Sequence, residues 1–368
     1  MKKTDTCSQL GEPDHQIPDN MKKHIITLLL SLSMASSSFA QDVDSVYFKV
    51  QESMNRVEVY MNESLFTAYR FEPALEKPVL FPLHAPDGTV LTRGYPIAPR
   101  MKERVDHPHQ VGLWFNFGDV NGYDFWNNSL AVPEERKAAY GRIIHWSIEQ
   151  LEAAGTQGVL KVKMDWVAPD NEQAEKLLEE STTFFFKAEN GAWMVDRITL
   201  LTAVKDSVIF TDNKEGMLAL RVDRAFEHPS DNPVVLSDAS GKSYELAVMD
   251  NEGVTGWYQN SEGDEGLDTW GKNARWVTLT GTKDSSDCTL ILMDHPKNIN
   301  FPSCWHARGY GLFSVNNMGR QVFNRKLDKF QLVLKKGESL TFRHRFVVAN
   351  GKLTKEEVEA LYGDFTSK

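Results

Sequence analysis

Motifs for several common kinds of enzyme chemistry are missing from this sequence. It contains no P-loop, no glycine-rich dinucleotide fingerprint, no HExxH zinc motif and no GxSxG around a serine. Each of these motifs supplies a defined part of a site, such as a phosphate cradle, two metal ligands or a nucleophile. Their absence argues against nucleotide, flavin and zincin chemistry, and we predict no cofactor and no bound metal.

Cysteine is scarce, with three in the whole chain. Cys7 precedes the predicted signal peptide described below, which leaves Cys288 and Cys304. An oxidising compartment would permit a bridge between these two. Two buried free thiols agree with the sequence equally well, because spacing along the chain does not give the distance between Cα atoms.

Long apolar runs are also rare. The apolar run at residues 25–34 follows two lysines and precedes small residues that end before Gln41, which is the pattern of a secretory signal peptide. It is too short to span a bilayer, and no later run is longer. An anchor helix or a buried strand is the alternative. We predict an upstream extension at residues 1–20, a signal peptide at residues 21–40, and export to the periplasm or the extracellular space.

Basic residues are fewer than acidic ones, and the formal net charge is −10 at pH 7. An acidic protein is poorly suited to bind nucleic acid or an anionic membrane surface. The expected partner is therefore a small molecule or an oligosaccharide. The sequence predicts no oligomeric state.

Helical periodicity is weak, whereas alternation of apolar and polar residues recurs along the chain, as is typical of half-buried strands. Strands are predicted at residues 56–62, 65–71, 111–117, 143–148, 159–167, 182–188, 192–204, 244–249, 275–280, 289–293, 330–334 and 340–348. The pattern predicts an all-β fold, a large antiparallel β-sandwich that forms a single domain over residues 41–368.

Two short helices and two long loops complete this prediction. The helices are expected at residues 171–180 and 354–362, the second with a capping box of Thr354 and Glu357 and an end at Gly363. Residues 130–140 and 261–268 are polar enough to be surface loops at the rim of a cleft.

Polar and aromatic side chains are concentrated in residues 104–126, which read RVDHPHQVGLWFNFGDVNGYDFW. His107 and His109 would share a face of an extended strand, where they can act as general acid and base or as two metal ligands. A polar strand end whose histidines bond to the backbone is the alternative. Carboxylates, amides and a Trp ring suit the hydroxyl edges and apolar faces of sugars. The binding candidates of this segment are Arg104, Asp119, Asn121, Asp124 and Trp126.

A second cluster lies at residues 221–229, which read RVDRAFEHP. Glu227 beside His228 is a candidate acid–base pair. A solvated edge strand with surface ion pairs explains the same residues equally well.

Two later segments add aromatic and cationic candidates. Trp270 is a candidate platform for a sugar ring, whereas Trp276 is expected in the core. His306, in the segment FPSCWHARGYG, is a further catalytic candidate, and Tyr310 is a binding candidate. Arg308 can hold the carboxylate of an acidic sugar through two parallel hydrogen bonds; an arginine that caps loop carbonyls is the alternative.

The segments ERVDHPHQVGLWF, GDVNGYDFW, FEHP and WHARGYGLFSVNNMG resemble an exported bacterial family of unknown function that is often labelled the PmoA family. The label refers to a subunit of methane monooxygenase that is an integral membrane protein, and the lack of a spanning helix argues against that activity. The family motif often reads HPHHRG. Gln110 and Val111 depart from it here, which weakens a site of three histidines.

The chain is also similar to galactose-mutarotase-like super-sandwiches, which occur in sugar epimerases, some polysaccharide lyases and accessory domains of glycoside hydrolases. In mutarotases a histidine acts as acid and a glutamate as base. The resemblance implies these roles for His107 or His109 and for Glu227.

The leading hypothesis is an exported carbohydrate-active enzyme, a hydrolase or lyase with epimerisation as a further option, that uses general acid–base catalysis. The catalytic candidates are His107, His109, Glu227 and His306. One alternative is a non-catalytic glycan-binding protein that uses the same aromatic and amide groups. Another is a metal-dependent oxidoreductase that uses His107, His109 and either His228 or His306.

Overall fold

The computed structural model describes residues 45–169 and 174–367. The predicted upstream extension and signal peptide lie outside the described residues and stay predictions. Within the described ranges, no helix is long and apolar enough to cross a membrane.

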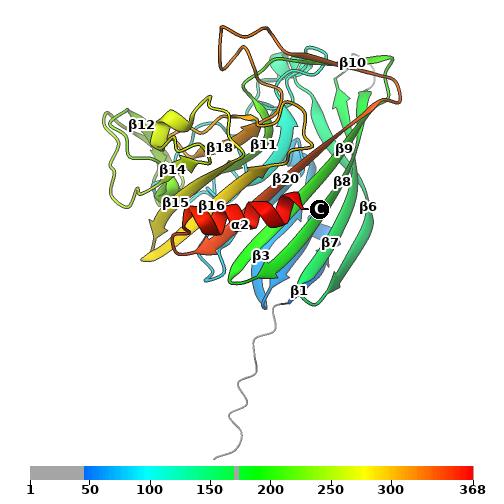
Figure 1. The fold of residues 1–368 in the computed structure, drawn as a ribbon. Coiled ribbons are helices and arrows are strands. Elements are labelled where there is room, and N and C mark those ends of the chain that lie inside the picture. The colour runs from blue at the N-terminus through cyan, green and yellow to red at the C-terminus, as the bar shows by residue number, and fades with distance from the viewer. Residues whose placement is uncertain (1–44, 170–173, 368) are drawn as a thin grey trace, which may run out of the picture. The chain divides into compact units, whose positions relative to one another are not determined.

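Two antiparallel sheets, each with eight strands in the described part of the chain, make up most of the fold (Figure 1). The first contains β1 (Val46–Gln51), β2 (Arg56–Met61), β3 (Ser64–Arg70), β4 (Val79–Leu83), β5 (Leu113–Phe117), β11 (Gly216–Arg221), β17 (Cys304–Trp305) and β18 (Leu312–Asn316). Its strand order is β1-β2-β3-β4-β5-β11-β18-β17.

The second sheet contains β6 (Arg142–Ala154), β7 (Gln157–Ala168), β8 (Glu175–Glu189), β9 (Ala192–Ala203), β14 (Trp257–Asn260), β15 (Trp276–Lys283), β16 (Ser286–Asp294) and β20 (Ser339–Asn350). Its strand order is β14-β15-β16-β20-β9-β8-β7-β6. Two smaller sheets pair β10 (Ser207–Thr211) with β19 (Gln331–Lys335), and β12 (Val234–Ser237) with β13 (Ser243–Leu246).

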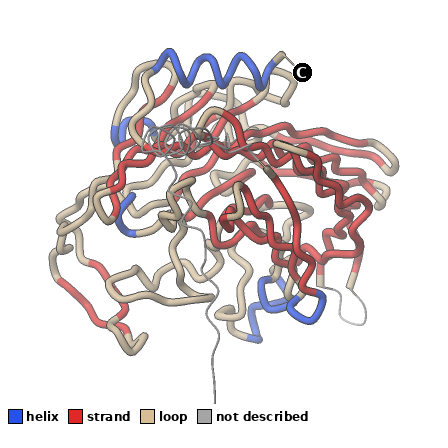
Figure 2. Tube along the Cα trace, turned by 90° about the horizontal axis from the view of Figure 1, so that it is seen from below, coloured by secondary structure: helices blue, strands red, loops and turns tan. Residues whose placement is uncertain are grey.

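Helical turns are few and short among the strands and loops (Figure 2). The described residues form the 3₁₀ helices η1 (Glu52–Met54), η2 (Pro73–Leu75), η3 (Glu134–Ala139), η4 (Arg224–Phe226) and η5 (Gly266–Thr269), and the helix α2 (Lys355–Thr366).

The main core lies between the two large sheets and follows the alternation of the strands. On β7, Leu160, Val162 and Met164 are buried in this core, and Lys163 between them is exposed. Full burial of one such apolar side chain contributes about 1.5–3 kcal/mol. The prediction of a large antiparallel β-sandwich with few helices is confirmed.

The other face of the first sheet carries a second apolar cluster and supports the candidate site. Trp114 on β5, Ala219 on β11 and Leu312 on β18 belong to it. Their sequence neighbours Leu113 and Phe313 point into the main core instead. Arg221 ends β11 two residues after Ala219 and therefore shares its face.

The predicted C-terminal helix is confirmed, including its capping box of Thr354 and Glu357. The expected end at Gly363 is wrong, because α2 continues to Thr366. Phe365 in this last turn packs on the second sheet and is only 5% exposed. That burial outweighs the roughly 1 kcal/mol that glycine costs inside a helix.

Two further expectations need correction. Of the predicted helix at residues 171–180, residues 171–173 lie outside the described ranges and 175–180 begin β8, between β7 and β9. Glu180 is fixed there by the Trp166 indole and by Arg197, which favours the strand. The edge strand proposed for residue 221 is instead β11, paired with β5 and β18.

The structure also decides between the two alternatives for the cysteines. Cys288 and Cys304 are both free and buried. Each stays a thiol on its own strand, β16 and β17 respectively.

Candidate functional site

A cavity of about 520 Å³ opens among the loops that connect the strands. Four separate chain segments surround it: the segment before β5, the segment after η4, the helix η5, and the turn between β17 and β18. Its lining residues are Arg104, His228, Pro229, Ser230, Asn232, Leu267, Trp270, Ala307, Arg308, Gly309 and Tyr310.

The turn that carries Arg308 is held by backbone hydrogen bonds. The Arg308 N–H donates to Leu312 O at 2.8 Å, and Tyr258 Oη–H donates to Arg308 O at 3.2 Å. The His228 N–H donates to Gly309 O at 2.9 Å, which ties two walls of the cavity together. A Cβ at Gly309 would lie 3.2 Å from Leu267 Cδ2, so the glycine lets the turn approach η5.

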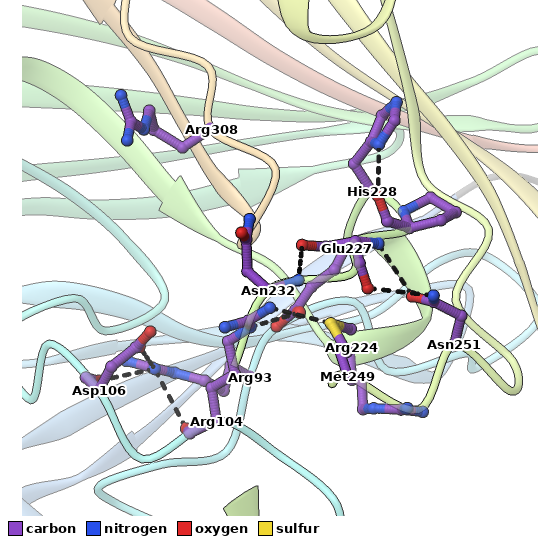
Figure 3. Close-up of polar contacts among 12 residues, drawn as sticks. Arg93, Arg104, Asp106, Arg224, Glu227, His228, Asn232, Met249, Asn251 and Arg308 are labelled. Carbon is purple, nitrogen blue, oxygen red and sulfur yellow. Dashed lines mark hydrogen bonds and ion pairs between the residues drawn. The ribbon is translucent and has the colours of Figure 1, made fainter. Parts of the chain in front are cut away.

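Arg104, which lines the cavity, forms an ion pair with Glu227 (Figure 3). Nε of Arg104 lies 2.7 Å from Oε2 of Glu227, and the carboxylate is buried. Burial raises the pKa of Glu227, although Arg104 and Arg221 act against this shift. Glu227 does not line the cavity, and its charge is already paired with Arg104.

Asp106, two residues after Arg104, forms ion pairs with two buried arginines. Its Oδ1 lies 2.8 Å from Nη1 of Arg93 and 2.7 Å from Nη2 of Arg221. Burial opposes ionisation of this carboxyl, but Arg221, a hydrogen bond from His107 and the charge of Arg93 outweigh it. Together they hold the pKa of Asp106 well below its usual range.

Arg93 also fixes the backbone of this segment. Its guanidinium donates to the carbonyls of Asp106, His107 and Gln110 at 2.8, 2.9 and 3.1 Å. His107 has a φ of 45°, in the left-handed region that is costly for a residue other than glycine. Such backbone conformations persist where the surroundings enforce them, and they cluster at functional sites.

The two predicted histidines differ in environment. The His107 side chain is 40% exposed and stacks on Tyr310, with ring centroids 5.0 Å apart. His109 is buried, and its Nε2 has no hydrogen-bond partner among the described residues. Burial lowers the pKa of His109 well below the usual value, so its ring is neutral at pH 7.

Lys77 is an unexpected buried cation next to this histidine. Its Nζ donates to the His109 carbonyl at 2.7 Å, and burial lowers the pKa of Lys77 to about 7. Its ammonium group lies 5.7 Å from the centroid of the Trp114 ring. No sequence motif marked this lysine.

His306 lies outside the cavity lining. Its Nδ1 is 3.1 Å from Lys214 O and 3.6 Å from Oε2 of Glu215, and the side chain is 2% exposed. Burial lowers the pKa of His306 to about 3. This geometry matches a histidine that holds the backbone of a neighbouring segment.

Four predicted binding residues hold loops in place instead of facing the cavity. Asp119 accepts a hydrogen bond from the Gly122 N–H, and Asp124 accepts from the Trp126 and Asn127 N–H groups. The Asn121 side chain bonds to the backbone of residues 207 and 209. Trp126 is completely buried against Trp114 and offers no ring face to a ligand.

Trp270 and His228, by contrast, do line the cavity. Trp270 is half-buried, and its Nε1 has no protein partner in the described part of the chain. The His228 ring stacks on Trp257, and its Nδ1 lies 2.9 Å from the Pro229 carbonyl oxygen. This contact puts a proton on Nδ1, so that Nε2 carries the lone pair of the neutral ring.

The described residues gather no group of three or more His, Cys, Asp or Glu side chains with the spacing of a metal site. The histidine pair of the oxidoreductase alternative therefore has no third ligand of these types within the described ranges.

A model of a family of unknown function, DUF6807, matches residues 56–363. The chain belongs to this family. Comparison with curated proteins finds no match.

Solved structures similar to the DUF6807 chain are each 10% identical to it. The galactosidase domain of alpha-galactosidase-sucrose kinase (AgaSK) aligns over 83% of the DUF6807 chain with a TM-score of 0.37, and the alignment spans 41% of that structure's length. A putative aldose 1-epimerase from Escherichia coli K12 aligns over 84% of this chain and 100% of its own, with a TM-score of 0.28. A galactose mutarotase related enzyme from Lactobacillus acidophilus aligns over 84% and 98%, with a TM-score of 0.29.

Sequence reasoning therefore found part of the site of the DUF6807 chain. Of the predicted residues, Arg104, Trp270, Arg308 and Tyr310 line the cavity. Asn232 was missed, because it stands in a loop with no motif of its own. Leu267 was not named as a binding residue, although it lies in the segment 261–268 that was expected at the rim of a cleft. His228 was proposed only beside Glu227 or as a metal ligand, and its place in FEHP was the available signal.

Proposed function

We propose that the DUF6807 chain is a carbohydrate-active enzyme that binds a sugar in this cavity and transfers protons to and from it. The composition of the lining carries this proposal. Trp270 and Leu267 offer apolar surface for the faces of a sugar ring, and Arg104, Arg308 and Asn232 offer donors for its polar groups.

Two groups in the lining suit proton transfer. His228 presents Nε2 with its lone pair and is the candidate base. Tyr310 is the candidate acid, because burial raises its pKa and keeps the phenol protonated at neutral pH. His107, whose ring stacks on the Tyr310 ring and is partly open to solvent, is a positioning candidate.

The lining favours elimination or epimerisation over hydrolysis. Glycoside hydrolases generally place two carboxyl groups on either side of the scissile bond, about 5–10 Å apart. No carboxylate is found among the residues that line this cavity in the described ranges. Elimination and epimerisation remove a proton from carbon and need a base and an acid, which His228 and Tyr310 supply.

Turnover of oligosaccharides by the full chain tests this proposal. Substrates are screened by product mass and by solvent deuterium incorporation, and the active substrate is then given to His228→Ala and Tyr310→Phe. Loss of a positioned acid or base should lower kcat by about 100-fold or more. His84→Ala and Tyr47→Phe, which alter residues outside the lining, are the matched controls.

Three results separate the alternatives. Binding without any product points to the non-catalytic glycan-binding protein. Equal turnover by all four variants contradicts the assigned roles. Neither binding nor turnover with any sugar contradicts the proposed function itself.

We also infer export, from the signal-peptide pattern before Gln41. Expression of the full chain in a secreting host should yield mature protein that begins at or near Gln41. N-terminal sequencing that finds the intact chain in the cytoplasm would contradict this inference. The finer resemblance to the family labelled PmoA stays a prediction.

A further inference from the structure

We propose that the sugar taken by this cavity carries a carboxylate, and that Arg308 binds it. The inference rests on the proposed function and adds to it the class of substrate.

The ion pairs that the arginines around the cavity form, or do not form, point to this role. Arg104 is paired with Glu227, and Arg93 and Arg221 share Asp106. Arg308 is exposed, and no described carboxylate lies within ion-pair distance of it. In Figure 3, Arg308 stands apart from the Arg104–Glu227 pair, and no dashed line reaches it.

The position of Arg308 is nevertheless defined. Its backbone is fixed by the hydrogen bonds to Leu312 and from Tyr258. Its guanidinium carbon lies 5.7 Å from the centroid of the Tyr310 ring, a cation–π contact. A cation on a held turn, against an aromatic face, loses little conformational freedom when it binds a ligand.

The net charge of the cavity agrees with an anionic ligand. Two guanidinium groups contribute to the lining, and one buried carboxylate behind it compensates Arg104. The cavity therefore keeps one uncompensated positive charge in a protein whose formal net charge is −10. A carboxylate is a well-matched anion for Arg308, because the planar guanidinium group can bind both carboxylate oxygens at once.

A carboxylate also explains how a weak base can remove a proton from carbon. In a uronate, the C5–H bond lies next to the carboxyl group, and neutralisation of that group by Arg308 makes the C5 proton more acidic. His228 Nε2 would take this proton, the C4=C5 double bond would form, and the C4–O bond would break. The leaving oxygen would take the Tyr310 proton, which gives an unsaturated uronate and a free alcohol with no change of redox state.

Binding of matched sugars tests the inference. The probes are trisaccharides of glucuronate, galacturonate, mannuronate and guluronate, their methyl esters, and the neutral trisaccharides of the same sugars, titrated by calorimetry. At least one uronate should bind ten-fold or more tightly than its own methyl ester. Arg308→Gln should remove this difference, whereas Arg325→Gln, at another exposed arginine, should keep it.

The variants and probes keep the outcomes distinct. Arg308 is exposed, so Arg308→Gln should unfold at the same temperature as the wild type. Neutral sugars that bind as tightly as every uronate would overturn the carboxylate inference but leave the proposed function standing. A sulfated trisaccharide that binds more tightly than all uronates would also overturn it. Failure of all sugars to bind contradicts the proposed function instead.

Discussion

Asp106 is the residue that organises the candidate site. It is the carboxylate in ion-pair contact with two arginines that are 1% and 0% exposed in their side chains. Burial and the charge of Arg221 lower the pKa of Arg93 to about 9, and Asp106 opposes this shift. One carboxylate therefore compensates the charge of two buried guanidinium groups. It also fixes the segment that carries Arg104 and His107.

Asp106→Asn should lower the free energy of unfolding by about 3 kcal/mol, because it leaves two buried guanidinium groups without a counter-charge. Urea denaturation monitored by tryptophan fluorescence measures this change. Asp328→Asn, at an exposed carboxylate, should change stability by less than about 0.5 kcal/mol. Equal stability of the two variants would mean that the arginines are compensated in another way.

At the scale of elements, η4 and the residue just before β14 place Glu227. Asp223 caps η4 by accepting the Ala225 N–H at 3.0 Å, and the Gly256 N–H donates to the Glu227 carbonyl at 2.8 Å. A Cβ at Gly256 would lie 2.0 Å from the carbonyl oxygen of Phe226. Only glycine allows the two segments to approach this closely.

Gly256→Ala should therefore push the Phe226–Glu227 backbone away and disturb the Arg104 ion pair. We expect a loss of about 1–3 kcal/mol in unfolding free energy, as is usual for overpacking, and weaker sugar binding. Gly253→Ala is a useful comparison, because a Cβ there would meet no atom within 4 Å, although its φ of 71° adds some strain. Gly256→Ala with the stability and binding of the wild type would show that η4 does not depend on this contact.

Elements and site were not equally predictable from the sequence. Alternation along β7 and the capping box of α2 are local signals, and they predicted that strand and the start of that helix correctly. The cavity depends on the pairing of β11 with β5 and β18, which are each about a hundred residues away along the chain. No local pattern encodes that pairing, so the sequence indicated Arg104 and Arg308 as binding residues but not which of the candidates line the cavity.

The same limit explains the binding residues that the structure places elsewhere. Asp119, Asp124 and Trp126 have the chemistry of a sugar site, but their segment folds back on itself. The carboxylates of Asp119 and Asp124 accept hydrogen bonds from neighbouring N–H groups, as turning backbone requires, and the Trp126 ring is buried against Trp114. Composition alone cannot distinguish a carboxylate that caps a turn from one that binds a ligand.

At the scale of the whole molecule, the cysteines predict how the fold responds to reductant. Burial raises the pKa of both the Cys288 and the Cys304 thiol to about 11. A reductant should leave the unfolding temperature unchanged, because no bond joins them. Alkylation and peptide mapping should modify both residues only after unfolding in guanidinium; a Cys288–Cys304 peptide from non-reduced protein would contradict the structure.

Buried histidines should make the whole fold sensitive to acid, and His344 allows a clean test. It is 1% exposed, lies in the core beside Phe342, and burial lowers its pKa to about 3. In the unfolded chain its pKa is about 6.5. Between these values the unfolded state binds a proton that the folded state does not, so stability falls as pH falls through this window.

His344→Gln removes the contribution of the His344 titration to the pH dependence of stability. The Oδ1 atom of the buried Asp294 lies 3.9 Å from the Nε2 atom of His344. The variant should be less stable than the wild type at pH 7.5, because packing is lost, and the gap between them should narrow by about 2 kcal/mol at pH 5. Urea denaturation at both pH values measures the gap. Phe342→Leu alters the same core without a titratable group, so its gap should not change with pH. A His344→Gln gap that is equally constant would mean that His344 takes up a proton in the folded protein.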